Sequence, residues 1–331
     1  MNPVDPPDLP GRRLGDAGPR VSALGLGCLG LSGGYGPVSE ADAVDVVRHA
    51  IDLGVTLVDT ADFYGDGRNE ELVGRAVAGR RDEVVIATRG GVRTARPGGP
   101  PSVVDGRPVS LRDACHASLR RLGVDHIDLY YLGRVDPAVP VADSVGALAE
   151  LVQAGKVGHI GLSEATPDQV RAAHSVHPVS ALETEYSLWE RHAEAAILPT
   201  VRELGIGFVA HTPLGKGMLT GVLRYPGELG ERDMRRNHPR FQGTNFARNR
   251  ELVDELELMA LARGLTPAQL ALAWLLARGD DVVPIPGTRS RDRLAENLAA
   301  LRVRLPADES RRLTELFTAD RVAGPRLPVR R

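Results

Sequence analysis

The chain has 331 residues, a length that permits one large domain or two ordinary ones. Hydrophobic residues make up 42%, charged residues 25%, and the formal net charge is -2, so nothing in the composition points to nucleic acid or an anionic membrane as a partner. No apolar run approaches the roughly 20 residues that span a bilayer, and the N-terminus lacks the apolar core of a secretory signal. The two cysteines give neither a disulfide framework nor a metal-ligand cluster. We therefore expect a cytoplasmic protein without a bound metal.

The first ten residues hold four prolines and are expected to be disordered. Residues 12–22 carry turn signals at Gly15 and Gly18, which favour a short β-hairpin. From there on, apolar β-type runs alternate with amphipathic helical segments. The expected strands are 23–28, 56–59, 84–88, 127–132, 157–163, 182–186, 207–212 and 282–285. The expected helices are 39–53, 69–78, 110–122, 141–154, 167–174, 194–204, one near 251–263, 266–278, 290–298 and 307–317.

Eight strands, each followed by a helix, fit a closed (β/α)8 TIM barrel with an N-terminal β-hairpin. A doubly wound open sheet is the alternative, but it usually has fewer strands, and no G-x-G-x-x-G opens a helix here. No linker-like composition divides the chain. We expect a single domain over 11–318, between the tail 1–10 and a C-terminal tail 319–331. The loops 94–108 and 216–249 are long enough to be functional insertions. No heptads or apolar stripe suggest an oligomer, so a monomer is expected.

Polar residues follow the expected strands, and strand ends converge on one pocket in a barrel. Asp59 and Tyr64 follow one strand and Arg89 the next. An acid, a phenol and a cation together suggest a proton-transfer site in which the pKa of the tyrosine is lowered. Taken singly, each has an ordinary interpretation as an N-cap, a loop tyrosine or a surface arginine. The other strand ends supply no cysteine nucleophile and no metal-spaced histidine–carboxylate cluster, which disfavours covalent and metal mechanisms.

Residues 284–297 form a second constellation, in which a strand ends, Gly287 turns the chain and a helix begins. The N–H groups of a helix N-terminus form an anion site. Arginine side chains at 289, 291 and 293 add forked cations that suit phosphate. A solvated basic helix is the plainer alternative. The position of this constellation after the eighth strand favours phosphate binding.

Six segments stand out in order along the chain: LVDTADFYGDGRNEELVGRAV, IDLYYLGRVDP, GKVGHIGLSEA, LETEYSLW, TPLGKGMLTG and VPIPGTRSRDRLAEN. With them the chain resembles the aldo-keto reductases, in particular bacterial members of the monomeric type, from about residue 12 to 317. The resemblance implies a TIM barrel that binds NADP(H) across its carboxyl-terminal face. It also implies hydride transfer between the nicotinamide and a small carbonyl or alcohol substrate, with a tyrosine as proton donor.

The resemblance places Asp59 and Tyr64 among the family's four catalytic residues, with Arg89 as the third. It implies cofactor contacts near the nicotinamide from Ser163, Glu183 and His211. Along the pyrophosphate it implies contacts from Leu214, Gly215 and Gly217. At the adenosine 2′-phosphate end the implied contacts come from Gly287, Thr288, Arg289, Arg293, Glu296 and Asn297. The expected walls of the substrate pocket are Tyr35, Gly133 and Trp189.

Four positions around the nicotinamide depart from the family pattern. Arg89 stands where the family has lysine, and it could pair bidentately with Asp59. Gly133 stands where the family has histidine. The loss of one such hydrogen-bond donor typically costs about 10²–10³ in rate. We expect a substrate group to fill the space left at Gly133. Glu183 replaces a usual glutamine, and His211 a usual tyrosine.

Three interpretations follow from these departures. The protein is a reductase retuned for an unusual substrate, an enzyme that runs oxidatively or redox-neutrally, or a catalytically silent NADP-binding protein. Under the second, an ionised Glu183 would favour the positively charged oxidised nicotinamide by Coulomb attraction. Retention of Asp59 and Tyr64 weighs against the third. Arg134 and Asp136, just past Gly133, are expected to form an ion pair that holds their loop.

Overall fold

The structure is a computed structural model that describes residues 9–93 and 103–327. Most of the tail 1–10, for which we expect disorder, therefore lies outside the described residues. So does part of the loop 94–108. Among the residues described, no helix is both long and apolar enough to cross a membrane.

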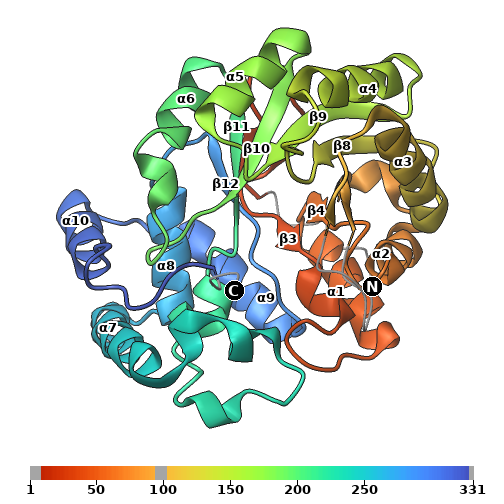
Figure 1. Cartoon of the computed structure of the whole chain (residues 1–331). Helices are drawn as coiled ribbons and strands as arrows, with labels where there is room; N and C mark the ends of the chain where they lie inside the picture. Colours follow the sequence, from red (N-terminus) through yellow and green to blue (C-terminus); the bar gives the residue numbers. More distant parts are fainter. Residues whose placement is uncertain (1–8, 94–102, 328–331) are drawn as a thin grey trace.

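Eight parallel strands neighbour one another in the order β12-β11-β10-β9-β8-β5-β4-β3. They are β3 (Leu26–Gly27), β4 (Leu57–Asp59), β5 (Val85–Gly90), β8 (Ile127–Leu132), β9 (Val157–Ser163), β10 (Val179–Glu185), β11 (Gly207–His211) and β12 (Val282–Pro284). The N–H of Gly25 donates to the carbonyl of Pro284 at 2.9 Å, and the N–H of Gly27 to that of Pro286 at 3.3 Å. These bonds join the two ends of the sheet into the ring that Figure 1 shows at the centre of the molecule. The predicted TIM barrel is confirmed.

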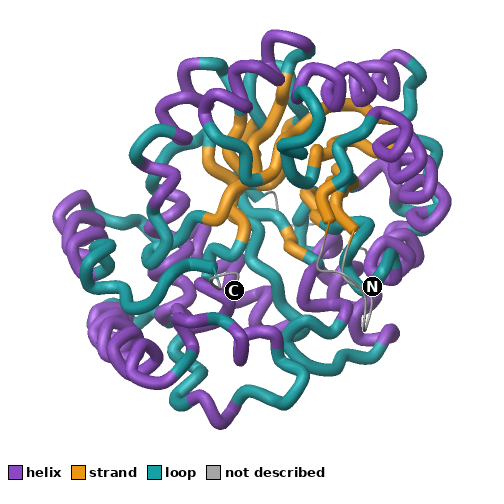
Figure 2. The backbone as a smooth tube through the Cα atoms, viewed as in Figure 1, coloured by secondary structure: helices purple, strands orange, loops and turns teal. Residues whose placement is uncertain are grey.

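Helices surround this ring on the outside, as the purple segments of Figure 2 show. They are α1 (Glu40–Asp52), α2 (Arg68–Val77), α3 (Pro108–Leu122), α4 (Val141–Gln153), α5 (Pro167–Val176), α6 (Ile197–Glu203), α7 (Gly243–Leu261), α8 (Pro267–Leu276), α9 (Arg291–Ala299) and α10 (Ala307–Leu316). Thr166 and Thr266 begin α5 and α8 with reciprocal capping boxes, in which the threonine hydroxyl and a glutamine three residues later satisfy free N–H groups.

The shorter elements lie in the connections. The 3-10 helices are η1 (Leu29–Ser32), η2 (Arg81–Glu83), η3 (His192–Glu194), η4 (Gly215–Thr220), η5 (Pro226–Glu228), η6 (Met234–Asn237), η7 (Pro239–Phe241) and η8 (Ala300–Arg302). A small antiparallel pair, β6 (Val92–Arg93) with β7 (Val103–Val104), extends beyond β5. The loop expected at 216–249 thus consists of short helical turns, and α7 already begins at Gly243.

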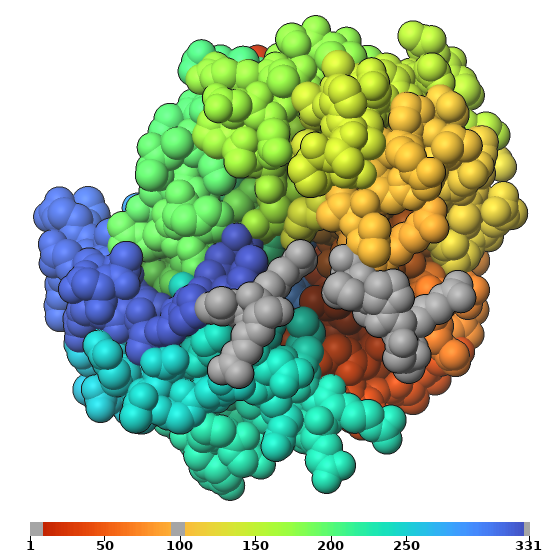
Figure 3. Space-filling model, viewed as in Figure 1, coloured from red at the N-terminus to blue at the C-terminus, as the bar shows by residue number. Residues whose placement is uncertain are grey.

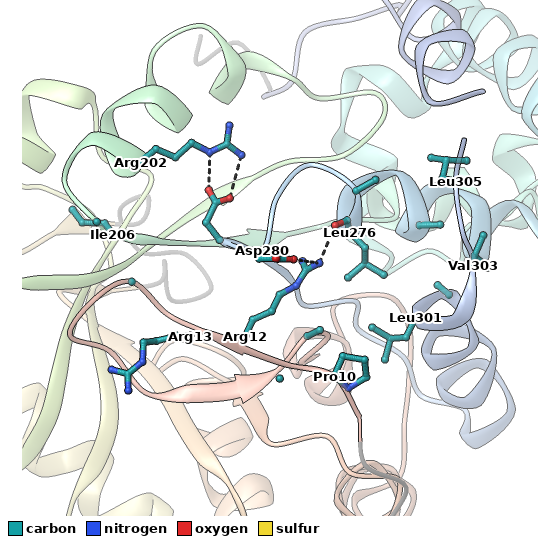
Figure 4. A pocket seen from close by; sticks show the side chains of 18 of the residues that line it. Pro10, Arg12, Arg13, Arg202, Ile206, Leu276, Asp280, Leu301, Val303 and Leu305 are labelled. Carbon is teal, nitrogen blue, oxygen red and sulfur yellow. Dashed lines mark hydrogen bonds and ion pairs between the residues drawn. The ribbon is translucent and has the colours of Figure 1, made fainter. Parts of the chain in front are cut away.

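The predicted N-terminal hairpin is present, with β1 (Gly11–Arg13) antiparallel to β2 (Arg20–Ser22). It closes the amino end of the barrel, where Leu14 joins the apolar side chains inside the ring. Beside it lies a cavity of about 760 Å³, drawn in Figure 4. Arg12 crosses this cavity and donates to the carbonyls of Val282 and Leu276, the latter at 2.9 Å. The hairpin thus fixes the floor of the barrel.

Side chains inside the barrel come from every second residue of the strands, as the strand period requires. The apolar interior is formed by residues that include Leu57, Ala87, Leu129, Ala181 and Val209. Two residues further along the same strands stand Asp59, Arg89, Tyr131, Glu183 and His211. The layer at the carboxyl end of the ring is therefore polar and charged, on top of an apolar one. Catalytic groups of TIM barrels come from this end of the strands.

Candidate active site

A buried ionic cluster lies in the polar layer. The Nη1 of Arg89 donates to Oε1 of Glu183 at 2.5 Å, its Nη2 donates to Oδ1 of Asp59, and its Nε donates to the carbonyl of Thr60 at 3.3 Å. Asp59, Arg89 and Glu183 are each no more than 3% exposed. The expected bidentate pairing of Arg89 with Asp59 alone is wrong, because Glu183 reaches across the barrel from β10 and takes one edge of the guanidinium.

The cluster carries one carboxylate more than it has cations. Burial raises the pKa of Asp59 well above its usual range, and Glu183 adds to this by its charge and a hydrogen bond, while Arg89 opposes it. Burial alone would lower the pKa of Arg89, but Asp59 and Glu183 raise it well above its usual value. Oδ2 of Asp59 and Oε2 of Glu183 are buried and accept no hydrogen bond from the described residues. Protonation of Asp59, which its raised pKa favours, relieves both the repulsion and the excess charge.

Tyr64 lies in the loop after β4, with its ring centroid 5.8 Å from Cζ of Arg89. Burial raises the pKa of Tyr64 above its ordinary value. Arg89 lowers this pKa, but Asp59 and Glu183 raise it again. The predicted lowering of the tyrosine pKa is wrong, because burial raises this pKa and the two carboxylates offset the cation. Tyr64 is therefore a protonated phenol at neutral pH, a state suited to donating a proton.

Gly133 follows β8 and lies close against neighbouring protein atoms. Its N–H donates to the carbonyl of Gly90 at 2.8 Å. A Cβ added at Gly133 would lie 2.8 Å from that same oxygen and 3.3 Å from Cγ2 of Val92. The expectation that a substrate group fills space at Gly133 stays a prediction, whereas a side chain at this position would need these neighbours to shift.

Arg134 turns toward β9 rather than toward its own loop. Its Nη1 donates to the carbonyl of Gly133 at 2.6 Å and to Oγ of Ser163 at 2.9 Å. The expected ion pair with Asp136 is absent from the described residues, and that prediction is wrong. Asp136 instead accepts from the N–H groups of Gly106 and Ala138, each at 2.9 Å. Backbone N–H groups thus satisfy the carboxylate of Asp136, and Arg134 instead contacts Ser163 in the candidate site.

A second charged cluster lies at the strand ends, and the sequence did not predict it. Nε2 of His211 contacts Oε1 of Glu164 at 2.7 Å, and Nη2 of Arg326 donates to the same oxygen. Nε of Arg326 donates to Glu185 at 2.6 Å, and Nζ of Lys216 donates to Glu185 at 3.2 Å. Burial alone would raise the pKa of Glu164, but His211 and Arg326 hold it well below its usual range. Glu164 directly follows the predicted strand end, whereas nothing in the sequence points to Arg326.

Arg326 belongs to the segment after α10. In Figure 1 this segment runs from the rim of the barrel to its centre, and in Figure 3 it borders the central hollow on this face. The N–H of Ala323 donates to Asn249 at 2.8 Å, and Arg240 donates to the carbonyl of Gly324 at 3.2 Å. The described part of the tail is therefore held on α7 and η7 and covers part of the site.

The loops that follow the strands contain strained backbone. Glu164, Thr212 and Lys216 have φ values of 57°, 54° and 56°, and Asp66 in the loop after β4 has 57°. Left-handed backbone at residues other than glycine costs about 1–3 kcal/mol, and it clusters at active and ligand sites. Its occurrence in three strand-end loops of one face supports a functional role for that face.

The turn predicted to follow a pyrophosphate lies after β11. Gly215 and Gly217 have φ values of 57° and 90°, and Leu214 is buried at its start. A Cβ on Gly215 would lie 2.6 Å from Nε1 of Trp189. Trp189 is buried beneath this turn. Tyr35 is half-buried in the loop after β3, and burial raises its pKa to about 12.

The three arginines near the start of α9 are not equivalent. Arg291 forms an ion pair with Asp45 of α1. Arg289 donates to the carbonyl of Pro37 at 3.0 Å, and Arg293 has no ion-pair partner in the described chain. Thr288 and Asn297 are buried, Glu296 is half-buried, and Gly287 lies where a Cβ would come 2.8 Å from the carbonyl oxygen of Gly27. Donors for an anion thus remain at this helix start.

Comparison with known proteins identifies the family. Residues 23–317 match the model of the Aldo/keto reductase family. "Probable aldo-keto reductase 1" of Glycine max is 44% identical over 318 residues, which cover 95% of this chain and 90% of that protein. The glycerol dehydrogenase of Gluconobacter oxydans matches over 100% of both chains, with a TM-score of 0.85 and 28% identity. An aldo/keto reductase of Klebsiella pneumoniae, solved with NADP and acetate, matches 90% of this chain and 92% of that one, with a TM-score of 0.71 and 28% identity. The predicted resemblance is confirmed: the chain belongs to the aldo/keto reductase family.

Proposed function

We propose that this protein is an NADP(H)-dependent oxidoreductase that reduces a carbonyl group, with Tyr64 as the general acid. The observation that carries the proposal is the protonated phenol of Tyr64 beside the buried guanidinium of Arg89, at the catalytic end of a barrel of this family. The relative from Klebsiella pneumoniae, solved with NADP, supports the choice of cofactor.

The side chains present fit such a cofactor at both of its ends. Ser163 accepts from Arg134, so its own O–H proton is free to donate to the carboxamide oxygen. Oε2 of Glu183 has no donor among the described residues, and an amide N–H would satisfy it. At the other end, the N–H groups that begin α9 and the cations of Arg289 and Arg293 suit a 2′-phosphate. Leu214, Gly215, Gly217, Gly287, Thr288, Glu296 and Asn297 are proposed to line the path between.

The chain's own residues handle the proton. When bound, the reduced cofactor supplies the hydride to the carbonyl carbon. Tyr64 donates its proton to the carbonyl oxygen as negative charge develops there, and the positive charge of Arg89 stabilises the phenolate that remains. That phenolate then takes a proton from solvent. A positioned general acid of this kind contributes about 10²–10⁴ in rate.

Reduction is the direction that the site favours. Oxidation of an alcohol requires Tyr64 as a base, and its raised pKa opposes that state. The negative charge of Glu183 is offset by Arg89 at 2.5 Å, so its attraction for an oxidised nicotinamide should be small. Comparable affinities for NADP+ and NADPH are therefore expected. A large preference for NADP+ would revive the oxidative interpretation.

The test measures NADPH consumption with a panel of aldehydes and ketones, together with NADPH binding by fluorescence titration. Tyr64→Phe should lower the turnover number about 10²–10⁴-fold and leave NADPH affinity unchanged. Tyr225→Phe, at a tyrosine that is 60% exposed, is the matched control and should change neither quantity. Binding of NADPH without turnover in the native protein would favour the silent interpretation, and absence of binding would refute the choice of cofactor.

A further inference from the structure

Among the described cations at the carboxyl ends of the barrel strands, Arg134 differs from Arg89, Lys216 and Arg326 in having no carboxylate partner. Arg89 contacts Glu183 at 2.5 Å, Lys216 contacts Glu185 at 3.2 Å, and Arg326 contacts Glu185 at 2.6 Å. Arg134 lies among these groups. Partial burial lowers its pKa, and the nearby charges of Glu164, Arg89, Glu183 and Arg326 also act on it. Yet no carboxylate of the described residues lies within ion-pair distance of Arg134, whose only acceptors there are neutral. Arg134 therefore makes no direct ion pair within the described chain.

The guanidinium of Arg134 is also held in one orientation. Nη1 is fixed by the carbonyl of Gly133 at 2.6 Å and by Oγ of Ser163 at 2.9 Å, and both of these residues are buried. Nε and Nη2 have no acceptor among residues 9–93 and 103–327, and the residue is exposed. A planar fork with one nitrogen fixed loses little entropy when its remaining donors bind a ligand. An exposed arginine is ordinarily just solvated, but this one is tied to the polar layer that also holds Asp59 and Glu183.

Two features make a carboxylate the best match for this group. The remaining guanidinium donors are arranged for bidentate binding of two oxygens in one plane, a geometry that carboxylates share. The partner Ser163 is the residue proposed to hold the nicotinamide carboxamide, so a group bound at Arg134 lies beside the reacting end of the cofactor.

We propose that Arg134 anchors the substrate and that the substrates are carbonyl compounds with a carboxylate group, that is, oxo acids. This inference rests on the proposed function and adds its substrate class. The carboxylate is unchanged in the reaction. The carbonyl carbon gains the hydride, the oxygen gains the proton of Tyr64, and the product is the corresponding hydroxy acid. Arg134 also supplies a fixed cation close to Gly133, where the family's histidine is missing.

The experiment compares matched substrates that differ in the carboxylate alone, namely 4-carboxybenzaldehyde against benzaldehyde and pyruvate against methyl pyruvate. The native protein should prefer the carboxylate member of each pair in kcat/KM. Arg134→Gln should lower kcat/KM for the carboxylate members about 10–100-fold, chiefly through KM, because a hydrogen-bonded charge is lost. The neutral members should change less than about twofold in kcat/KM. Arg134→Lys keeps the charge without the fork and should restore part of the loss.

Two further readouts separate this inference from the proposed function. NADPH affinity should fall far less in Arg134→Gln than affinity for a carboxylate, because a glutamine amide can also donate to Oγ of Ser163. Binding of benzoate to the NADP+-loaded protein, measured by calorimetry, should weaken about 10–100-fold in the variant even if no substrate turns over. The control Arg171→Gln, at an exposed arginine paired with Glu203 on the outside of the barrel, should change none of these quantities.

The results that would overturn the inference are specific. They are equal losses for charged and neutral substrates, no preference of the native protein for the charged members, benzoate affinity unchanged by Arg134→Gln, or a loss confined to NADPH affinity. Absence of turnover with every substrate would refute the proposed reductase activity instead, and benzoate binding would then decide the role of Arg134 separately.

Discussion

Replacement of Glu183 by glutamine changes the charge of the buried cluster but hardly its shape. The glutamine carbonyl can accept from Nη1 of Arg89 as the carboxylate does, and its amide can donate to Oδ2 of Asp59, which has no donor among the described residues. The replacement removes the repulsion and the hydrogen bond through which Glu183 raises the pKa of Asp59. In the variant, burial still raises the pKa of Asp59, but without Glu183 this pKa should be lower than in the native protein.

The expected effect on stability depends on pH. In the native protein the pKa of Asp59 is raised above its unfolded value, so the folded state keeps a proton that the unfolded state releases above about pH 4. The free energy of unfolding therefore falls by about 1.4 kcal/mol per pH unit as the pH rises from there toward the raised pKa. Glu183→Gln should show a shallower slope, because burial still acts on Asp59 but Glu183 no longer does. Its advantage over the native protein should therefore grow with pH, by at most about 1.4 kcal/mol per pH unit.

Urea unfolding of both proteins over this pH range measures the difference. Burial and Glu70 raise the pKa of Asp62 to about 7. Asp62 therefore adds a similar pH dependence to the stability of both proteins, and its contribution cancels in the difference. Glu71→Gln, at an exposed glutamate of α2, is the matched control and should give a difference that does not grow with pH. A difference in stability that is constant with pH would refute the contribution of Glu183 to the raised pKa of Asp59.

Three other outcomes are expected. Gly133→Ala should lower the free energy of unfolding by about 1–3 kcal/mol, since the added Cβ would lie 2.8 Å from a backbone carbonyl oxygen. The control Gly146→Ala in α4, where a Cβ would have nothing within 4 Å, should not destabilise the protein. Urea unfolding compares the two variants. Arg326→Ala should cost about 1–3 kcal/mol at neutral pH. Because Arg326 helps to hold the pKa of Glu164 low, this cost should shrink as acid protonates that carboxylate, and a cost constant with pH would contradict the contact. Burial raises the pKa of Cys28, so a thiol reagent should not modify it in the folded protein; fast modification, measured by mass spectrometry, would contradict its burial.

The fold could be predicted from the sequence because two local signals repeat along it. Continuous apolar runs predict strands that are buried on both faces, and capping and glycine signals bound the helices between them. The ends of 127–132 and 157–163 agree with the structure to the residue. The strand expected at 23–28 is only Leu26–Gly27, because the ring closes there through glycines rather than through a regular ladder. The start of α7 was missed because its first turns carry few apolar residues.

The candidate site could be predicted in part. The position of Asp59, Arg89 and Glu183 at strand ends follows from the barrel, since parallel strands bring their carboxyl ends to one face. Which groups touch across the ring does not follow, because Arg89 and Glu183 are 94 residues apart in sequence and meet through the curvature of the sheet. The pKa of Tyr64 depends on that contact, so its direction was predicted wrongly. The position of Arg326 depends on how the tail crosses the barrel, which no local pattern indicates.

The hairpin at one end of the barrel and the tail at the other have a practical consequence. The described chain begins near Pro10, beside the cavity at the amino end, and its last described residues contact Glu164 and Glu185 at the opposite end. A surface linker attached through the first described residues would therefore start from the face away from the site. One attached through the last described residues would start next to Arg326. Binding and activity measurements are best made with N-terminally attached protein, and a comparison of the two attachments reports how freely the tail moves.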